Sequence, residues 1–453
     1  DLGEIVVDPN FSLYYVSVQQ STLGDGVTAI DEIRTAVATQ HRLDKPTIAN
    51  HVLASVHRAI EKGDGGATVA VRRGTPGEIV AVWPGFVDTA FGIAVDVGST
   101  TVAGHLIDLT TGDVAASAGV MNPQIRFGED LMSRVSYVMM NPGGDKELTT
   151  AIRTSLNALA LELCSKATVA ATDVLEIVLV GNPIMHHILL GIDPTPLGAA
   201  PFVLATDEAV SGDARELGLE LPNASYYVGP CIAGHVGADT AGAILAEGPH
   251  RGSSMQLLID VGTNAEIVLG DSSRQFAASS PTGPAFEGAQ LSCGQRATAG
   301  AIEKVRIDKD TLEPRFKVIG IGPWSDEPGF ADAVVDTPIT GVCGSGIIEV
   351  IAEMYLSGII SQDGVIQGSI GEKTSRVVAD DRTFSYVLYE KGETRLLITQ
   401  NDIRAIQLAK AALRAGIDLL VEHAGSPEVS DIRLAGAFGA HIDPVYAMVL
   451  GLV

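Results

Sequence analysis

The sequence predicts a duplicated α/β domain preceded by a smaller α/β unit. A buried-strand pattern ends in Asp96-Val97-Gly98 and then a run of hydroxyl residues, and the same order returns at Asp260-Val261-Gly262. In both halves a helix-like stretch, a strand and a glycine follow, at 148–181 and 402–436. Repetition of hairpin, helix, strand and glycine in one order indicates a duplication, and a cleft between the two copies is where a ligand is expected.

Length and pattern divide the chain into three parts. The 453 residues suffice for two or three domains, each with its own core. Residues 1–88 are predicted to form a small α/β linker or middle domain with two helices and a hairpin, and we assign them no chemistry. Residues 89–250 are the first copy of the repeat. Residues 251–453 are the second copy, which carries an insertion between its hairpin and its last helix.

Composition limits the classes of partner. Hydrophobic residues make up 46% of the chain and charged residues 19%, as in a globular protein. The formal net charge of −25 argues against nucleic acid or an anionic membrane as a partner, because both are bound through an excess of Lys and Arg. No secretory signal or membrane-spanning run is recognised, so a cytoplasmic location is expected.

The four cysteines follow no metal-binding pattern. They are far apart in sequence, without a C-x-x-C pair or a histidine at ligand spacing: Cys164, Cys231, Cys293 and Cys343. We expect reduced, mostly buried thiols and a purified chain that is colourless and binds no iron.

The two hairpin turns have the composition of phosphate-binding loops. Glycine lets backbone N–H groups approach an anion, and neighbouring hydroxyl and amide side chains add donors. The carboxylates at the strand ends, Asp96 and Asp260, are predicted to hold the water shell of Mg²⁺ and to act in catalysis. The residues expected to bind the nucleotide in the two turns are Gly98, Ser99, Thr100 and Thr101, and Gly262, Thr263 and Asn264.

A third glycine-rich segment, Gly344-Ser345-Gly346, opens a predicted helix within the insertion. Such a segment can seat a phosphate on the helix N-terminus, where unpaired N–H groups point outward. It can equally be an ordinary N-cap. Both interpretations stay open at this point.

These motifs together resemble those of the actin, sugar-kinase and heat-shock-chaperone ATPase superfamily. The resemblance rests on the paired hairpins, the small-residue segment 233–243 and the glycine-rich segment 436–439. It implies an actin-like, ribonuclease H-like ATPase fold with ATP in the cleft between the halves. It also implies an adenosine motif that contacts the adenine or ribose through Gly436, Ala437, Phe438 and Gly439.

A closer resemblance is to the reductive activators of corrinoid proteins. It is carried by Asn122-Pro123-Gln124 and by the segments 181–187, 283–288 and 341–346. The resemblance implies an ATP-dependent protein that returns the Co(II) corrinoid (cobalamin) protein of a methyltransferase system to Co(I). The electron would come from a ferredoxin-type donor with a 2Fe-2S cluster, and we expect the activator to be a homodimer.

The chain departs from that family in two ways. Family members carry an N-terminal plant-type ferredoxin module, whereas no C-x₄-C-x₂-C run is present here. They also continue beyond the adenosine motif into a second connecting helix, which is missing after Val453. We therefore expect either a fragment of a longer protein or a separate chain as the electron carrier.

The segment 279–288 is predicted to face the partner. Two prolines, two glycines and three hydroxyl residues indicate an exposed, rigid loop at the mouth of the cleft. We expect Ser279, Ser280 or Thr282 to face the corrinoid and Glu287 to anchor the loop. A structural turn beside the nucleotide is the alternative.

Two other functions are compatible with the motifs. A small-molecule kinase of the same superfamily would need a base near the γ-phosphate, and Asp260 or Glu287 could serve. An actin-like filament or chaperone protein is the other alternative, although no long apolar β subdomain for peptides is recognised.

Overall fold

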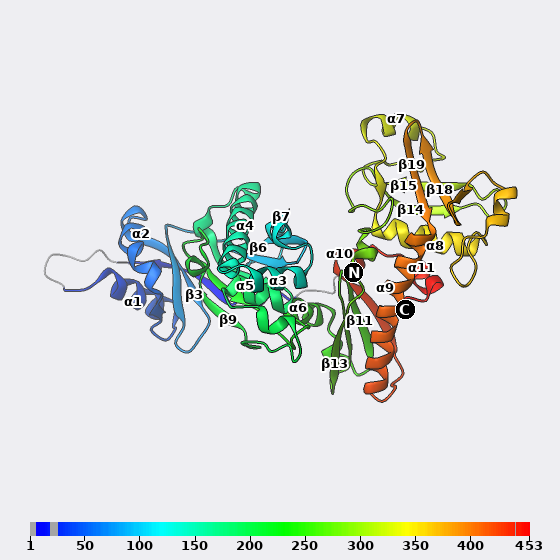
Figure 1. Ribbon diagram of the computed structural model, residues 1–453. Coiled ribbons are helices and arrows are strands. Elements are labelled where there is room, and N and C mark those ends of the chain that lie inside the picture. Colours follow the sequence, from blue (N-terminus) through cyan, green and yellow to red (C-terminus); the bar gives the residue numbers. More distant parts are fainter. Residues whose placement is uncertain (1–5, 19–25, 440) are drawn as a thin grey trace. The chain divides into compact units, whose positions relative to one another are not determined.

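The structure is a computed structural model that describes residues 6–18, 26–439 and 441–453, with only the backbone of 437 and 438. The chain forms two compact units, Asp1–Gly242 and Ala243–Val453. Figure 1 shows the elements of both units in sequence colours. Each unit has sheets and a hydrophobic core of its own.

The first unit begins with a four-stranded sheet in the order β1-β3-β4-β2. Its strands are β1 (Phe11–Ser17), β2 (Thr47–Ile48), β3 (Gly66–Arg72) and β4 (Glu78–Pro84). Helices α1 (Ala29–His41) and α2 (Val56–Lys62) pack on one face through residues such as Ile33 and Ile60. On the other face, Trp83 belongs to a second apolar cluster that also contains Leu175 of the next sheet. The hairpin predicted in this region is present as the antiparallel pair β3–β4.

A six-stranded sheet follows, in the order β7-β6-β5-β8-β10-β9. Its strands are β5 (Phe91–Val97), β6 (Thr101–Asp108), β7 (Val114–Met121), β8 (Val174–Val180), β9 (Val210–Asp213) and β10 (Ser225–Val228). The accompanying helices are α3 (Leu131–Met140), α4 (Gly144–Ala167), α5 (Pro183–Leu190) and α6 (Ala238–Glu247). Apolar side chains at helical spacing, from Leu148 to Leu163, place one face of α4 on the sheet.

The second unit repeats this arrangement. Its main sheet has the order β13-β12-β11-β20, matching β7-β6-β5-β8. The strands are β11 (Gln256–Val261), β12 (Ala265–Gly270), β13 (Gln275–Ser280) and β20 (Asp431–Ala435). Helix α9 (Gln400–His423) precedes β20 as α4 precedes β8, and β20 and β8 both run parallel to the first strand of their hairpin. The predicted duplicated α/β fold is therefore confirmed.

The predicted insertion lies between β13 and α9. It forms two three-stranded sheets, one of β14 (Ala301–Ile307), β15 (Pro314–Val318) and β16 (Gly341–Val342), the other of β17 (Val377–Asp380), β18 (Thr383–Lys391) and β19 (Thr394–Thr399). Helices α7 (Phe330–Asp336) and α8 (Gly344–Leu356) accompany them. The unit ends with α10 (Gly436–Gly439) and α11 (Pro444–Leu450).

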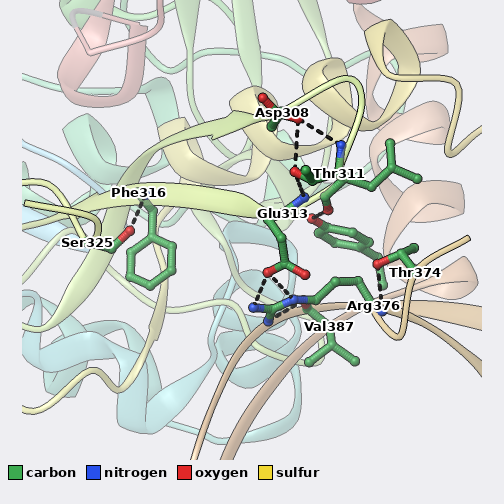
Figure 2. Close-up of polar contacts among 10 residues, drawn as sticks. Asp308, Thr311, Glu313, Phe316, Ser325, Thr374, Arg376 and Val387 are labelled. Atoms are coloured by element: carbon green, nitrogen blue, oxygen red, sulfur yellow. Dashed lines mark hydrogen bonds and ion pairs between the residues drawn. The ribbon is translucent and has the colours of Figure 1, made fainter.

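Polar contacts join the two sheets of the insertion (Figure 2). The Arg376 guanidinium donates to Glu313 Oε2 from Nε at 2.9 Å and from Nη2 at 2.6 Å. The buried Tyr386 hydroxyl donates to the carbonyl oxygen of Leu312 at 2.9 Å. The β14–β15 turn that carries Leu312 and Glu313 is itself closed by Asp308, which accepts from the backbone N–H of Thr311. These contacts hold the two sheets of the insertion together.

In the described part of the chain, no helix is long and apolar enough to cross a membrane. All four cysteines are free and buried. Burial raises the pKa of the Cys231 and Cys293 thiols to about 12 each, so both stay protonated at neutral pH.

Candidate functional site

The first hairpin turn connects the carboxyl end of β5 to the amino end of β6. Asp96 is the penultimate residue of β5, opposite Ala103 on β6 and Val180 on β8. Its carboxylate is exposed, and Gly98, Ser99 and Thr100 form the turn into β6. The predicted metal-shell carboxylate and the predicted phosphate turn are therefore neighbours at one sheet edge.

Asn122, which follows β7, holds this turn in place. Its side-chain Nδ2 donates to the Gly98 carbonyl oxygen at 2.8 Å, and its backbone N–H donates to Thr100 O at 2.9 Å. Its Oδ1 accepts from the backbone N–H of Gln124 at 2.9 Å. The Asn122 side chain is fully buried, so these contacts replace hydration that it has lost. The Asn-Pro-Gln motif is thus a support for the first phosphate turn.

Arg134 of α3 supports the same turn from below. Its guanidinium is completely buried and donates to the carbonyl oxygens of Ser99 at 2.5 Å and Gly128 at 3.1 Å. It also donates to Gln124 Oε1 at 3.3 Å. Burial lowers the Arg134 pKa to about 10, which leaves it cationic at neutral pH. Sequence reasoning missed this residue because it precedes a buried valine on a mostly apolar helix.

The turn after β8 brings a third segment to this edge. A Cβ on Gly181 would lie 2.9 Å from the Val97 carbonyl oxygen, so glycine permits the close approach. The Gly181 carbonyl oxygen accepts from the Ala238 N–H at 2.9 Å, and Asn182 caps α5 by accepting from Met185 N–H at 3.0 Å. The end of β5, the turn after β8 and the start of α6 therefore meet.

Asp239 joins this group and was not predicted as a site residue. It lies in the first turn of α6, and its Oδ1 accepts from the Thr240 N–H at 2.7 Å. Burial of the carboxylate raises its pKa above the ordinary value of an aspartate. The sequence feature that could have identified Asp239 is that it is the single acidic residue in the small-residue segment 231–242. A carboxylate kept there at a cost in solvation is typical of a functional position.

The second hairpin turn is supported by different side chains. The Thr282 hydroxyl donates to the carbonyl oxygens of Gly262 at 2.9 Å and Thr263 at 3.1 Å. The Thr263 hydroxyl donates to Glu287 Oε1 at 2.8 Å, and the Gly262 N–H donates to Asn264 O at 3.0 Å. The segment after β13 therefore braces the predicted phosphate turn. This agrees with the alternative prediction for the segment, a structural turn beside the nucleotide.

The exposure expected for this segment is wrong for two of its three hydroxyl residues. Ser279 and Ser280 end strand β13 and are not in a loop. Ser280 is 5% exposed and Thr282 is 6% exposed, and the Ser280 hydroxyl donates to Ala412 O at 2.7 Å. Each hydroxyl is satisfied by a main-chain carbonyl, which is how a polar residue is accommodated inside a core. Ser279 is partly exposed and donates to Glu266 Oε1 at 3.2 Å.

Asp260 occupies the position in β11 that Asp96 occupies in β5. It lies opposite Glu266 on β12 and Ala435 on β20. Gly436, with φ of +82°, passes so close that a Cβ there would clash with Asp260 Oδ1. Glycine is therefore required both for the backbone conformation and for the space beside the carboxylate. Of the other predicted adenosine residues, Gly439 is buried, and the side chains of Ala437 and Phe438 lie outside the described part of the structure.

The Gly344-Ser345-Gly346 segment opens α8 and has a packing role. A Cβ on Gly346 would clash with the Ile302 carbonyl oxygen of β14. The Ser345 hydroxyl donates to Glu303 O at 3.3 Å, and the N-cap residue is Cys343, whose side chain makes no cap hydrogen bond. The glycine at 346 is thus explained by the close contact of helix and strand, while phosphate binding there stays a prediction.

Each unit therefore presents one carboxylate, one glycine-containing turn and hydroxyl groups at a single sheet edge. Among the described residues, no group of three or more His, Cys, Asp and Glu side chains is placed to hold a metal ion directly. The donors suit an anion, and the carboxylates suit a cation that keeps its own water ligands.

Three family models match consecutive parts of the chain. The RACo linker region matches residues 1–89, the RACo middle region matches 91–252, and the C-terminal domain of RACo, described as the ASKHA domain, matches 254–453. A solved structure of a reductive activator for corrinoid, iron-sulfur protein is similar with a TM-score of 0.85 at 29% identity, covering 100% of this chain and 71% of that one. The expected actin-like ATPase fold and the expected family resemblance are both confirmed.

Two curated relatives are similar in sequence. The corrinoid activation enzyme RamQ of Eubacterium limosum is 36% identical over 375 residues, which cover 80% of this chain and 60% of the relative. The [Co(II) methylated amine-specific corrinoid protein] reductase of Methanosarcina barkeri is 24% identical over 385 residues, covering 80% of this chain and 65% of the relative. The chain thus spans less than two thirds of the length of either protein.

Replacing Arg134 by Met should destabilise the first unit and weaken nucleotide binding. The change keeps most of the volume but leaves the Ser99 and Gly128 carbonyls without their donor, at a cost of about 3 kcal/mol. Urea unfolding and ATP titration measure the two effects. The exposed Arg126→Met variant is the control and should change neither, and an Arg134→Met chain as stable as the control would contradict the assigned role.

Replacing Asp239 by Asn should stabilise the nucleotide-free chain at neutral and alkaline pH. Because the folded-state pKa is raised, ionisation of Asp239 costs stability as the pH rises above the ordinary carboxyl value. The advantage of Asp239→Asn should therefore grow from pH 4 to pH 8, measured by urea unfolding. Asp113→Asn, at an exposed turn, is the control. An advantage that stays constant with pH would show that the carboxylate is not disfavoured.

Proposed function

The chain belongs to the RACo family, and we propose that it uses ATP to drive the reduction of a Co(II) corrinoid protein to Co(I). The observation that carries the proposal is the repeated sheet edge, with Asp96 and Asp260 in equivalent positions and a supported glycine turn beside each. The names of the two curated relatives support corrinoid proteins as the substrate class. The same names do not favour the small-molecule kinase.

We propose that Mg-ATP is held by the two turns, with Asp96 and Asp260 directing the water ligands of the metal. Backbone N–H groups and hydroxyls from Gly98–Thr101 and Gly262–Asn264 would bind phosphate oxygens. Gly436 packs directly against Asp260, where a Cβ would clash with Oδ1, which supports placing the adenosine segment beside this carboxylate. Adenosine contacts by Gly436, Ala437, Phe438 and Gly439, and phosphate contacts by Gly344, Ser345 and Gly346, belong to the same proposal.

The energetic requirement is modest. An uphill one-electron step of about 200 mV costs roughly 4 to 5 kcal/mol, at 59 mV per tenfold change in equilibrium constant. Two conformations whose affinities for a ligand differ by about 10⁴ supply a free energy of that size. Nucleotide binding that favours one conformation, coupled to the corrinoid protein binding that same conformation, would be sufficient.

The electron donor is proposed to be a ferredoxin-type protein or module with a 2Fe-2S cluster outside this chain. The buried, separated cysteines do not suit a cluster, and the chain spans only part of its curated relatives. The homodimer and the cytoplasmic location stay predictions, as do the domain boundaries near 88 and 250.

Asp96→Ala and Asp260→Ala should each abolish ATP hydrolysis while leaving the fold intact. Each change removes a carboxylate proposed to orient the metal's water ligands, with little loss of core volume. Phosphate release measures hydrolysis, and circular dichroism checks folding. Asp113→Ala, at the exposed turn between β6 and β7, is the matched control and should hydrolyse ATP at the wild-type rate. Unchanged hydrolysis in both site variants would refute the proposed metal site.

Single substitutions in the segment 279–288 should separate support of the turn from contact with the partner. Thr282→Val removes the hydroxyl that braces Gly262 and Thr263, so we expect ATP affinity to fall by about tenfold, or about 1.4 kcal/mol. Ser279→Ala should spare ATP binding and weaken binding to a Co(II) corrinoid protein if Ser279 faces that partner. Equal affinity of wild type and Ser279→Ala for the corrinoid protein would remove Ser279 from the contact surface. The burial of Ser280 removes it from the partner-facing residues, and the anchoring role of Glu287 stays a prediction.

A further inference from the structure

An uninterrupted run of apolar residues is exposed on the first unit. All five residues of 199–203 are exposed, including Phe202 and Val203, of which the latter is 55% exposed. Runs of this length are avoided on protein surfaces unless they serve a function. Ile232, in the segment that precedes α6, is another exposed apolar residue, at 44%.

The two segments are built together. The rings of Phe202 and His235 meet edge to face with centroids 4.3 Å apart. Gly234 lets the chains approach so closely that a Cβ there would clash with the Phe202 carbonyl oxygen. Phe202 itself has φ of +56°, a conformation that costs energy for a residue with a side chain. We call residues 199–203 and Ile232 the apolar patch.

The two segments that carry the apolar patch contain no charged side chain, and the exposed Asp207 lies beside them, its carbonyl oxygen accepting from the Cys231 N–H at 3.1 Å. Residues 194–206 and 227–238 contain no Asp, Glu, Lys or Arg, in a chain whose net charge is −25. His235 is the titratable side chain that lies directly against the patch. Docking at this surface would depend on apolar burial and hydrogen bonds, and little on ion pairs.

Both segments of the apolar patch are tied to the turn after β8. The Ala205 N–H donates to His187 Nε2 at 2.9 Å, so the neutral His187 ring carries its hydrogen on Nδ1. The Nδ1–H group then donates to Pro183 O at 2.9 Å. On the other side, the segment of Ile232 continues into α6, where Ala238 N–H donates to Gly181 O. A displacement of the first phosphate turn would therefore reach both segments through residues 181–183.

We propose that the apolar patch is the docking surface for the face of the corrinoid protein that exposes its corrin ring. This inference rests on the proposed function. The edge of a corrin carries methyl groups and neutral amide side chains, so it matches an apolar run that lacks charged side chains and is flanked by one imidazole. Since the patch is connected to the first phosphate turn through residues 181–183, its affinity for the corrinoid protein depends on nucleotide.

The test is the double variant Val203→Asp/Ile232→Asp, with Val114→Asp as the control. Val114 is 58% exposed, close to the 55% of Val203, and it begins strand β7 of the same unit. The probe is a Co(II) corrinoid protein of a methyltransferase system, with and without its cobalamin, titrated in the presence of Mg-ATP. The double variant should bind the cobalamin-loaded protein at least about tenfold more weakly. The control should match wild type, and ATP affinity should be the same in all three chains.

Salt and cobalamin distinguish the type of contact. Wild-type affinity should change by less than about threefold between roughly 50 and 500 mM NaCl, because the contact is uncharged. Removing cobalamin from the probe should lower wild-type affinity and abolish the difference between wild type and double variant. A double variant that binds the loaded probe like wild type overturns the inference, as does a defect that is equal with and without cobalamin.

Two further outcomes separate this inference from its premise. If the double variant binds the probe normally but loses a wild-type dimer in analytical ultracentrifugation, the patch is an interface between copies and the inference is overturned. If wild type neither binds nor reactivates the loaded probe although it hydrolyses ATP, the proposed function fails, and the inference fails with it.

Discussion

The buried guanidinium of Arg134 is the contact on which the first half of the site depends. A buried cation must donate its hydrogen bonds to several acceptors, and here the acceptors are the Ser99 and Gly128 carbonyl oxygens and Gln124 Oε1. Removing any one acceptor leaves a donor of a buried charge unsatisfied. The turn, the Asn-Pro-Gln segment and α3 are therefore held in one arrangement, which keeps the N–H groups of the turn available for an anion.

In the second copy, the equivalent hairpin turn is supported without a buried cation. Thr282 donates one hydroxyl to two carbonyl oxygens of its turn, and Glu287 accepts from Thr263. Neutral or surface-linked hydrogen bonds cost less desolvation than a buried charge, so the two equivalent turns are supported by different means.

Two features of the first unit cost stability, and both lie near the proposed site. Asp239 keeps a carboxylate where burial disfavours its charge, and the apolar patch leaves hydrophobic area in water. Neither is required by the core of the first unit. Both lie next to the turn after β8, which contacts the end of β5. The residues that destabilise the first unit are therefore gathered around this turn.

The amino-acid sequence alone determined the duplication and the family, and it predicted the two phosphate turns with Asp96 and Asp260, because these are patterns of neighbouring residues whose periodicity and chemistry are local. What it could not determine depends on side chains from distant segments. Ser280 and Thr282 have polar composition but lie inside, because carbonyl oxygens from α9 and from the second turn meet their hydroxyls. The support by Arg134, the raised pKa of Asp239 and the joining of Phe202 to His235 are equally decided by tertiary packing, since burial and hydrogen-bond partners exist only once the strands and helices have assembled.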